Sequence, residues 1–126
     1  MDQTPGPTRV FVVDDEANIA CTLATILRIH GFDARHFTEP HEAMSAARLD
    51  CPDLLISDVV MPLLSGIELA IQMRQYCPEC RILLFSGQAG NSDLLQAAQA
   101  KGHHFEVLLK PVHPSVLLDK IRKRKI

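Results

Sequence analysis

The sequence lacks the features that mark membrane proteins, secreted proteins and general nucleic-acid binders. It contains no tryptophan, and 13 Lys+Arg against 15 Asp+Glu give a formal net charge of −2, whereas nucleic-acid-binding domains usually have a pI above about 9. Its longest apolar runs, such as residues 10–13 and 82–85, are far shorter than the roughly 20 residues that span a membrane. Residues 1–7 show neither the basic start nor the apolar stretch of a signal peptide. We therefore expect a cytoplasmic protein that binds neither membranes nor nucleic acid directly.

Only four cysteines occur, and without an export signal we expect reduced thiols rather than a disulfide framework. Cys77 and Cys80 form a Cys-x-x-Cys pair. Reactive pairs of this kind stand at the start of a helix, whereas this pair follows a predicted helix. Cys51 falls on the same edge of the predicted fold, close to the pair. A zinc site or a disulfide among these three residues is the alternative that we favour less.

A chain of 126 residues has the length of one domain. Residues 1–7, which include two prolines and a glycine, predict a flexible lead-in, and residues 8–124 predict the folded domain. Short apolar runs alternate with amphipathic stretches, and the runs are residues 10–13, 34–37, 54–56, 82–85 and 107–109. This alternation predicts an α/β fold of three layers, in which helices cover both faces of a five-stranded parallel sheet.

The amphipathic stretches carry helix start and stop signals. The predicted starts are Thr38 as a cap before Pro40, Ser65, Asn91 or Ser92, and Pro114. Gly31 and Gly102 follow two of the helices as C-terminal stops. The basic residues 120–125 are interpreted as the solvated end of the last helix, where cations suit the helix dipole.

Polar side chains stand where the predicted strands end, and ligands of such folds gather at that edge. The residues are Asp14 and Asp15 after the first strand, Asp58 at the end of the third, Ser86 at the end of the fourth, and Lys110 after the fifth. Three carboxylates and one ammonium sum to −2, and carboxylates this close repel one another unless a cation joins them. Mg²⁺ prefers such oxygen ligands and keeps waters free for phosphate. The sequence therefore predicts a metal site that can accept a phosphoryl group.

These residues resemble the receiver domain of two-component response regulators, the CheY-like superfamily, over residues 8–124. The resemblance rests on Asp14-Asp15-Glu16, Asp58 followed by Met61-Pro62 and Gly66, Ser86-Gly87, and Lys110-Pro111. It implies a flavodoxin-like, doubly wound (βα)5 sandwich with strand order 2-1-3-4-5. It also implies a signalling protein rather than an enzyme, one that catalyses only its own phosphorylation and dephosphorylation. The phosphoryl donor would be a sensor histidine kinase or a phosphotransfer protein, and the reader would be a downstream effector domain or protein.

The resemblance also implies a role for each site residue. Asp58 would be the phospho-acceptor and, with Asp15, a direct ligand of Mg²⁺ or alternatively Mn²⁺, while Asp14 would bind the ion directly or through water. The backbone carbonyl of Val60 would complete the metal site. Lys110 would contact the phosphoryl oxygens, and the hydroxyl of Ser86 would turn toward them as a switch. The Lys110–Pro111 bond looks like the cis peptide common in the family.

One position departs from the family pattern, and two others bear on how long the phosphoryl group survives. The family usually has Tyr or Phe three residues before the lysine, where this sequence has Val107. Either Phe105, on the same strand face, substitutes for it, or the domain works without an aromatic switch, which is the interpretation that we favour. Val60 and Gln88 stand where the family tunes the phosphoryl lifetime, and the apolar Val60 predicts a long-lived phosphorylated state.

Two other function classes fit the same architecture less well. A flavodoxin-type small-molecule binder needs a Ser/Thr/Gly-rich loop after the first strand, where Asp14 and Asp15 would repel a phosphate. A metal-dependent phosphatase using Asp58 needs a second acid close to the nucleophile, and Val59-Val60 supplies none. The motifs carry no information on the kinase, the target or the association of two copies.

Overall fold

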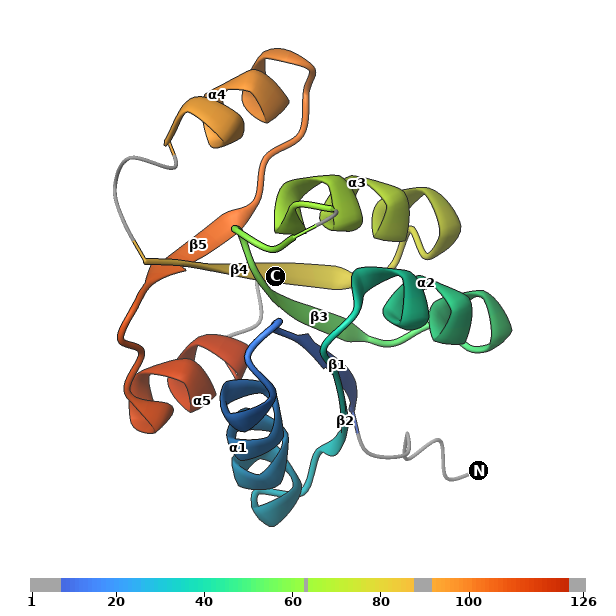
Figure 1. Ribbon diagram of the computed structural model, residues 1–126. Helices are drawn as coiled ribbons and strands as arrows, with labels where there is room; N and C mark the ends of the chain where they lie inside the picture. Colours follow the sequence, from blue (N-terminus) through green and yellow to red (C-terminus); the bar gives the residue numbers. More distant parts are fainter. Residues whose placement is uncertain (1–7, 63, 88–91, 123–126) are drawn as a thin grey trace.

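The computed structural model describes residues 8–62, 64–87 and 92–122, where five strands alternate with five helices (Figure 1). In chain order the elements are β1 (Arg9–Val13), α1 (Ala17–Ile29), β2 (Asp33–Phe37), α2 (Pro40–Leu49), β3 (Leu54–Asp58), α3 (Gly66–Tyr76), β4 (Arg81–Ser86), α4 (Ser92–Ala100), β5 (Glu106–Leu109) and α5 (Pro114–Arg122). The predicted lead-in, residues 1–7, and Gln88 lie outside the described residues.

The five strands form one sheet of order β2-β1-β3-β4-β5, and each neighbouring pair is parallel. Both the predicted fold class and the predicted strand order are therefore confirmed. β1, β3 and β4 lie inside the sheet and are buried along almost their whole length. The edge strand β2 buries only Ala34 and Phe37 of its five residues. Continuous apolar runs are what strands covered on both faces require.

Helices cover both faces of the sheet, with α1 and α5 on one side and α2, α3 and α4 on the other (Figure 1). Alternate residues of β1 enter the two cores, because side chains along a strand point to opposite faces. Phe11 and Val13 pack with α2 and α3, whereas Val10 and Val12 pack with α1 and α5. Full burial of such an aliphatic or aromatic side chain contributes roughly 1.5–3 kcal/mol, so the two cores hold the strand ends in place.

The predicted starts at Ser65 and Pro114 and the stops at Gly31 and Gly102 hold, whereas Asn91 and residues 123–125 lie outside the described residues. α3 begins after Ser65, whose hydroxyl accepts a hydrogen bond from the Glu68 amide at 3.1 Å while the Glu68 carboxylate accepts one from the Ser65 amide. α5 begins at Pro114 as predicted. The prediction of Thr38 as a cap is wrong: the residue before Pro40 is Glu39, and its side chain makes no capping hydrogen bond.

The expectation of reduced cysteines is also wrong, because Cys51 and Cys77 form a disulfide. Cys51 follows α2 and Cys77 is the C-cap of α3, and these two helices pack against each other on the same face. Their Cα atoms lie 5.8 Å apart, within the range that a disulfide bridges. Cys21 is a free, exposed thiol and Cys80 a free, buried one. Within the described parts of the chain, no cysteine belongs to a group that could hold a metal ion.

Candidate functional site

Three carboxylates and one ammonium meet at the carboxyl edge of the sheet. The amine of Lys110 lies 3.2 Å from Oδ2 of Asp58 and 3.4 Å from Oδ2 of Asp14. Asp14, Asp15 and Asp58 each offer a carboxylate oxygen within 4.8 Å of the other two. Asp14 and Lys110 are thus in direct contact although 96 positions separate them in the chain, because parallel strands bring their carboxyl ends to one edge of the sheet.

Backbone hydrogen bonds continue past the strand ends and hold the site residues in register. The Asp14 amide donates to the Phe37 carbonyl at 3.1 Å, the Val59 amide to the Phe85 carbonyl at 2.9 Å, and the Lys110 amide to the Ser86 carbonyl at 2.8 Å. The Asp14 carboxylate accepts a further hydrogen bond from the Glu16 amide at 2.9 Å. This carboxylate is therefore fixed by main chain on one side and by Lys110 on the other.

The start of α3 packs tightly against the end of β3. The Gly66 amide donates to the Val59 carbonyl at 2.8 Å, and a Cβ on Gly66 would overlap the main-chain carbonyl of Asp58. The Ser57 hydroxyl donates to the same Asp58 carbonyl at 2.9 Å. Sequence reasoning missed Ser57, although a hydroxyl directly after the apolar run of residues 54–56 was the available signal; the structure buries it completely.

The surroundings of Asp14 and Lys110 raise the pKa of both groups, which favours the neutral form of the acid and the charged form of the amine. Burial raises the pKa of the Asp14 carboxyl above its ordinary value of 3.8, and the neighbouring Asp58 charge adds to the rise, while the Glu16 amide and Lys110 oppose it. Burial alone would lower the pKa of Lys110. The hydrogen bond to Asp58 and the charges of both aspartates outweigh burial and raise it, so the ammonium stays charged.

The donor set fits a hard divalent cation. With all three carboxylates ionised, the three negative charges and the single Lys110 charge sum to −2, which one divalent ion balances. Three carboxylate oxygens within a few ångströms of one another match the oxygen-only ligand preference of Mg²⁺. Val60, whose carbonyl the family resemblance assigns to this site, follows the buried Val59 and is itself 58% exposed.

The remaining predicted residues are placed as follows. Ser86 is buried at the end of β4, and its carbonyl binds the Lys110 amide. The Lys110–Pro111 peptide is cis, as the resemblance implied. Gln88 lies outside the described residues, so its predicted role stays a prediction.

Phe105 and Val107 pack against the same core, but Phe105 lies outside the strand whose face it was predicted to share. Phe105 precedes β5, whereas Lys110 follows it, so the ring lies at the opposite end of the strand from the acidic cluster. The Arg74 guanidinium stands 4.5 Å from the Phe105 ring centroid and donates to the His104 carbonyl at 3.0 Å. Phe105 is thus held by α3.

Comparison with known proteins identifies the family. The sequence matches the response regulator receiver domain over residues 10–122. It is 32% identical over 120 residues to the phosphoglycerate transport system transcriptional regulatory protein PgtA of Salmonella typhimurium, covering 92% of this chain and 28% of PgtA. It is 28% identical over 116 residues to the DNA-binding response regulator MtrA of Mycolicibacterium paratuberculosis, covering 92% of this chain and 50% of MtrA. A response regulator receiver domain protein from Clostridium thermocellum superposes with a TM-score of 0.80 at 28% identity, covering 90% of each chain.

The fold and the sequence match together define a signalling domain, and the chain belongs to the response regulator receiver family. Members of this family are signalling domains of two-component systems and generally bind Mg²⁺. The chain spans half or less of the length of the two curated relatives named above. Across residues 8–62, 64–87 and 92–122, no helix is both long and apolar enough to cross a bilayer.

Proposed function

We propose that this receiver domain accepts a phosphoryl group on Asp58 from a phosphohistidine of a sensor histidine kinase or phosphotransfer protein. The observation that carries the proposal is the position of the Asp58 carboxylate. It is 13% exposed, lies 3.2 Å from the Lys110 amine, and shares an acidic cluster with Asp14 and Asp15. Asp58 is the member of the cluster that ends a strand. Its main-chain carbonyl accepts a hydrogen bond from the Ser57 hydroxyl and packs against Gly66.

Each neighbouring group has a part in the reaction. An oxygen of Asp58 attacks the phosphorus, the P–N bond of the phosphohistidine breaks, and its electron pair stays on the imidazole nitrogen, which takes up a proton. Lys110 donates hydrogen bonds to the phosphoryl oxygens and offsets their charge. Asp14, Asp15, Asp58 and the Val60 carbonyl would hold Mg²⁺, or Mn²⁺ in its place. The bound ion supplies charge neutralisation and alignment of the incoming phosphoryl group.

The phosphorylated form would act as a signal by local electrostatics. The acyl phosphate adds about two negative charges next to Lys110 and Ser86, and the buried Ser86 hydroxyl is proposed to turn toward the phosphoryl group. Exposed apolar side chains on β5 and α5, Leu109 and Val116, support a protein-binding output face there. The reader of that face would be an effector domain or protein, and the domain itself would catalyse only its own phosphorylation and dephosphorylation.

Incubation with phosphoramidate and Mg²⁺ tests the proposal, because this donor carries the same P–N bond as phosphohistidine. Intact-mass spectrometry should show one added phosphate, which hydroxylamine removes because the product is an acyl phosphate. Asp58→Asn should lose the mass shift. Asp53→Asn, at the opposite end of β3, should keep it. A shift that survives in Asp58→Asn, or that resists hydroxylamine, would place the phosphate elsewhere and overturn the proposal.

A further inference from the structure

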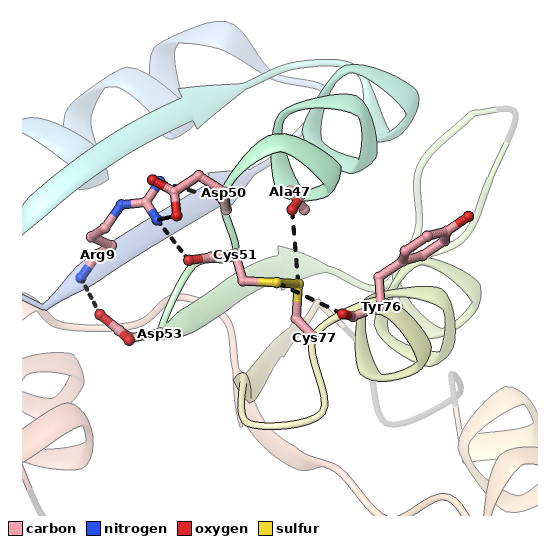
Figure 2. Close-up of polar contacts among 7 residues, drawn as sticks. All are labelled: Arg9, Ala47, Asp50, Cys51, Asp53, Tyr76 and Cys77. Carbon is pink, nitrogen blue, oxygen red and sulfur yellow. Dashed lines mark hydrogen bonds and ion pairs between the residues drawn. A yellow bond between two sulfur atoms is a disulfide. The ribbon is translucent and has the colours of Figure 1, made fainter.

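The disulfide between Cys51 and Cys77 lies at the edge of the sheet opposite the acidic site, between the ends of α2 and α3 (Figure 2). Its two cysteines differ in accessibility. Cys51 is an exposed residue of the loop after α2, whereas Cys77 is 2% exposed within the core. A nucleophile from solvent can therefore reach the disulfide at the Cys51 sulfur and not at the Cys77 sulfur.

Each sulfur also lies near a main-chain carbonyl. The Tyr76 carbonyl oxygen is 3.7 Å from Cys51 Sγ, and the Ala47 carbonyl oxygen is 4.0 Å from Cys77 Sγ. In the disulfide neither sulfur carries a hydrogen. Once reduced, each thiol can donate to the carbonyl beside it, so that the buried Cys77 thiol is not left without an acceptor.

Other contacts hold the two segments in place without the covalent bond. Arg9 forms an ion pair with Asp50 at 2.8 Å and donates to the Cys51 carbonyl at 2.6 Å, so that its side chain spans the Asp50–Cys51 segment (Figure 2). The Arg9 amide donates to the Asp53 carboxylate at 2.8 Å. On the other side, the Cys77 amide closes the last turn of α3 on the Met73 carbonyl at 2.7 Å. Opening the disulfide would leave both segments anchored.

The third cysteine of the region is not a competing nucleophile. Cys80 is 4% exposed, and its sulfur lies 3.4 Å from the Arg81 carbonyl. Burial, with the Asp53 charge adding to it, raises the pKa of the Cys80 thiol to about 12. Thiol–disulfide exchange proceeds through the thiolate, so Cys80 stays protonated and outside the exchange.

We propose that Cys51 and Cys77 are a reversible redox site, opened by dithiol reductants at the Cys51 sulfur and closed again by disulfide oxidants, in a domain that stays folded in both states. A thiolate of the dithiol attacks Cys51 Sγ, the Cys51–Cys77 bond breaks, and Cys77 leaves as a thiolate that takes up a proton. The second thiol of the dithiol then displaces Cys51 from the mixed disulfide. Two electrons pass from the dithiol to the protein, and the reductant becomes a cyclic disulfide. This site is independent of the proposed phosphoryl acceptance.

Thiol counting and peptide mapping test the connectivity. After treatment with glutathione disulfide, which also caps the exposed Cys21, iodoacetamide under denaturing conditions should label Cys80 and, where it is left uncapped, Cys21, and after dithiothreitol it should label all four cysteines. Trypsin places Cys51 in residues 49–74 and both Cys77 and Cys80 in residues 75–81. A Glu-specific protease then cuts after Glu79 and separates the two. Four labelled cysteines in the oxidised sample, or a bond to Cys80, would overturn the proposal.

Native-state kinetics test the entry at Cys51. Reduction of the folded protein should have a rate proportional to the dithiothreitol concentration and should leave the far-UV circular dichroism intact. A rate that is independent of dithiothreitol and equal to the unfolding rate would mean a bond that opens only on unfolding, and would overturn the proposal.

Variants that each replace one of the two bonded cysteines give a second test of which sulfur is attacked. In Cys77→Ala the exposed Cys51 thiol should take up glutathione from glutathione disulfide at least tenfold faster than the Cys77 thiol does in Cys51→Ala. Cys21→Ala, which removes a distant exposed thiol, is the matched control and should leave the Cys51–Cys77 disulfide in place. Equal uptake at both sulfurs, or faster uptake at Cys77, would contradict the proposed order of attack. If either variant fails to fold, the reduction kinetics of the wild-type protein still test the entry at Cys51.

Discussion

Gly66 lies directly against the main-chain carbonyl of Asp58, so that a single added methyl group on residue 66 would overlap that oxygen. The same methyl carbon would stand 3.0 Å from the Ser57 hydroxyl, which itself donates to the Asp58 carbonyl. The first residue of α3 and the last residue of β3 therefore leave no space between them. This close approach fixes the main chain that carries the proposed phospho-acceptor.

Gly66→Ala should lower the free energy of unfolding by about 2 kcal/mol, since a methyl group forced into a filled space displaces α3 or β3. Urea unfolding followed by circular dichroism measures it. Gly87→Ala is the matched control: a Cβ there meets nothing within 4 Å, so the change should stay within about 0.5 kcal/mol. Equal effects of the two substitutions would show that the contact at Gly66 has no energetic weight.

Glu106 should give the protein a small pH-dependent stability. Burial acts to raise the pKa of this carboxyl, but the hydrogen bond from Arg81 at 3.0 Å and the charges of Arg81 and Lys120 outweigh it and hold the pKa below its ordinary value of 4.5. A lowered folded-state pKa stabilises the protein above the unfolded-state value, and the stabilisation is lost as pH falls through the folded-state pKa.

Glu106→Gln should therefore lower the free energy of unfolding at neutral pH by about 0.5 kcal/mol, a modest value because the pair is partly exposed. The difference from wild type should persist down to the ordinary Glu value of 4.5 and disappear at lower pH. Urea unfolding over this pH range measures it, with the exposed Glu79→Gln as control. A difference that grows on acidification would contradict the assignment.

Lys110→Met should tighten Mg²⁺ binding. The Lys110 ammonium lies within 3.4 Å of two of the three carboxylates, so its removal makes the cluster more negative by one charge. At a partly exposed site this corresponds to about a tenfold gain in affinity. Isothermal titration calorimetry measures it. Lys120→Met, on α5 beside Glu106, is the control and should leave the affinity for Mg²⁺ unchanged. An unchanged affinity in Lys110→Met would show that Mg²⁺ does not bind at this cluster.

Val60→Asn should shorten the lifetime of the phosphorylated state several-fold. Val60 is 58% exposed two residues after Asp58, and its apolar side chain offers no hydrogen bond to a hydrolytic water, whereas an amide does. The decay of the phosphorylated mass after removal of the donor measures the lifetime. Val116→Asn, at the 51% exposed valine of α5, is the control. A lifetime that Val60→Asn leaves unchanged would remove this explanation.

Much of the fold was predictable because it follows from local patterns. The apolar runs predicted the buried strands, and alternation with amphipathic stretches predicted parallel pairing. Parallel pairing in turn predicted that Asp14, Asp58 and Lys110 meet at one edge, as they do at 3.2 and 3.4 Å. No knowledge of which individual residues contact each other was needed, because the parallel topology itself brings the carboxyl ends of the strands together.

The features that sequence reasoning missed depend on three-dimensional packing. The sequence placed Cys51 near Cys77 and left a disulfide as the less favoured alternative, because no pattern along the chain encodes the 5.8 Å between their Cα atoms that the bond requires. The absent cap at Thr38 reflects a shift of one residue, because Glu39 rather than Thr38 precedes Pro40. Helix boundaries of this kind vary by a residue or two even between methods of assignment.

The bond between Cys51 and Cys77 also makes residues 51–77 a covalent ring, and the whole of β3 with Asp58 lies within it. A force that pulls the ends of the chain apart would bypass this ring, because tension passes through the sulfurs. The 26-residue separation, at about 3.3–3.6 Å of extension per residue, means that the fully stretched oxidised chain should be about 85 Å shorter than the reduced one. Single-molecule stretching in the two redox states would show the ring as that difference in length.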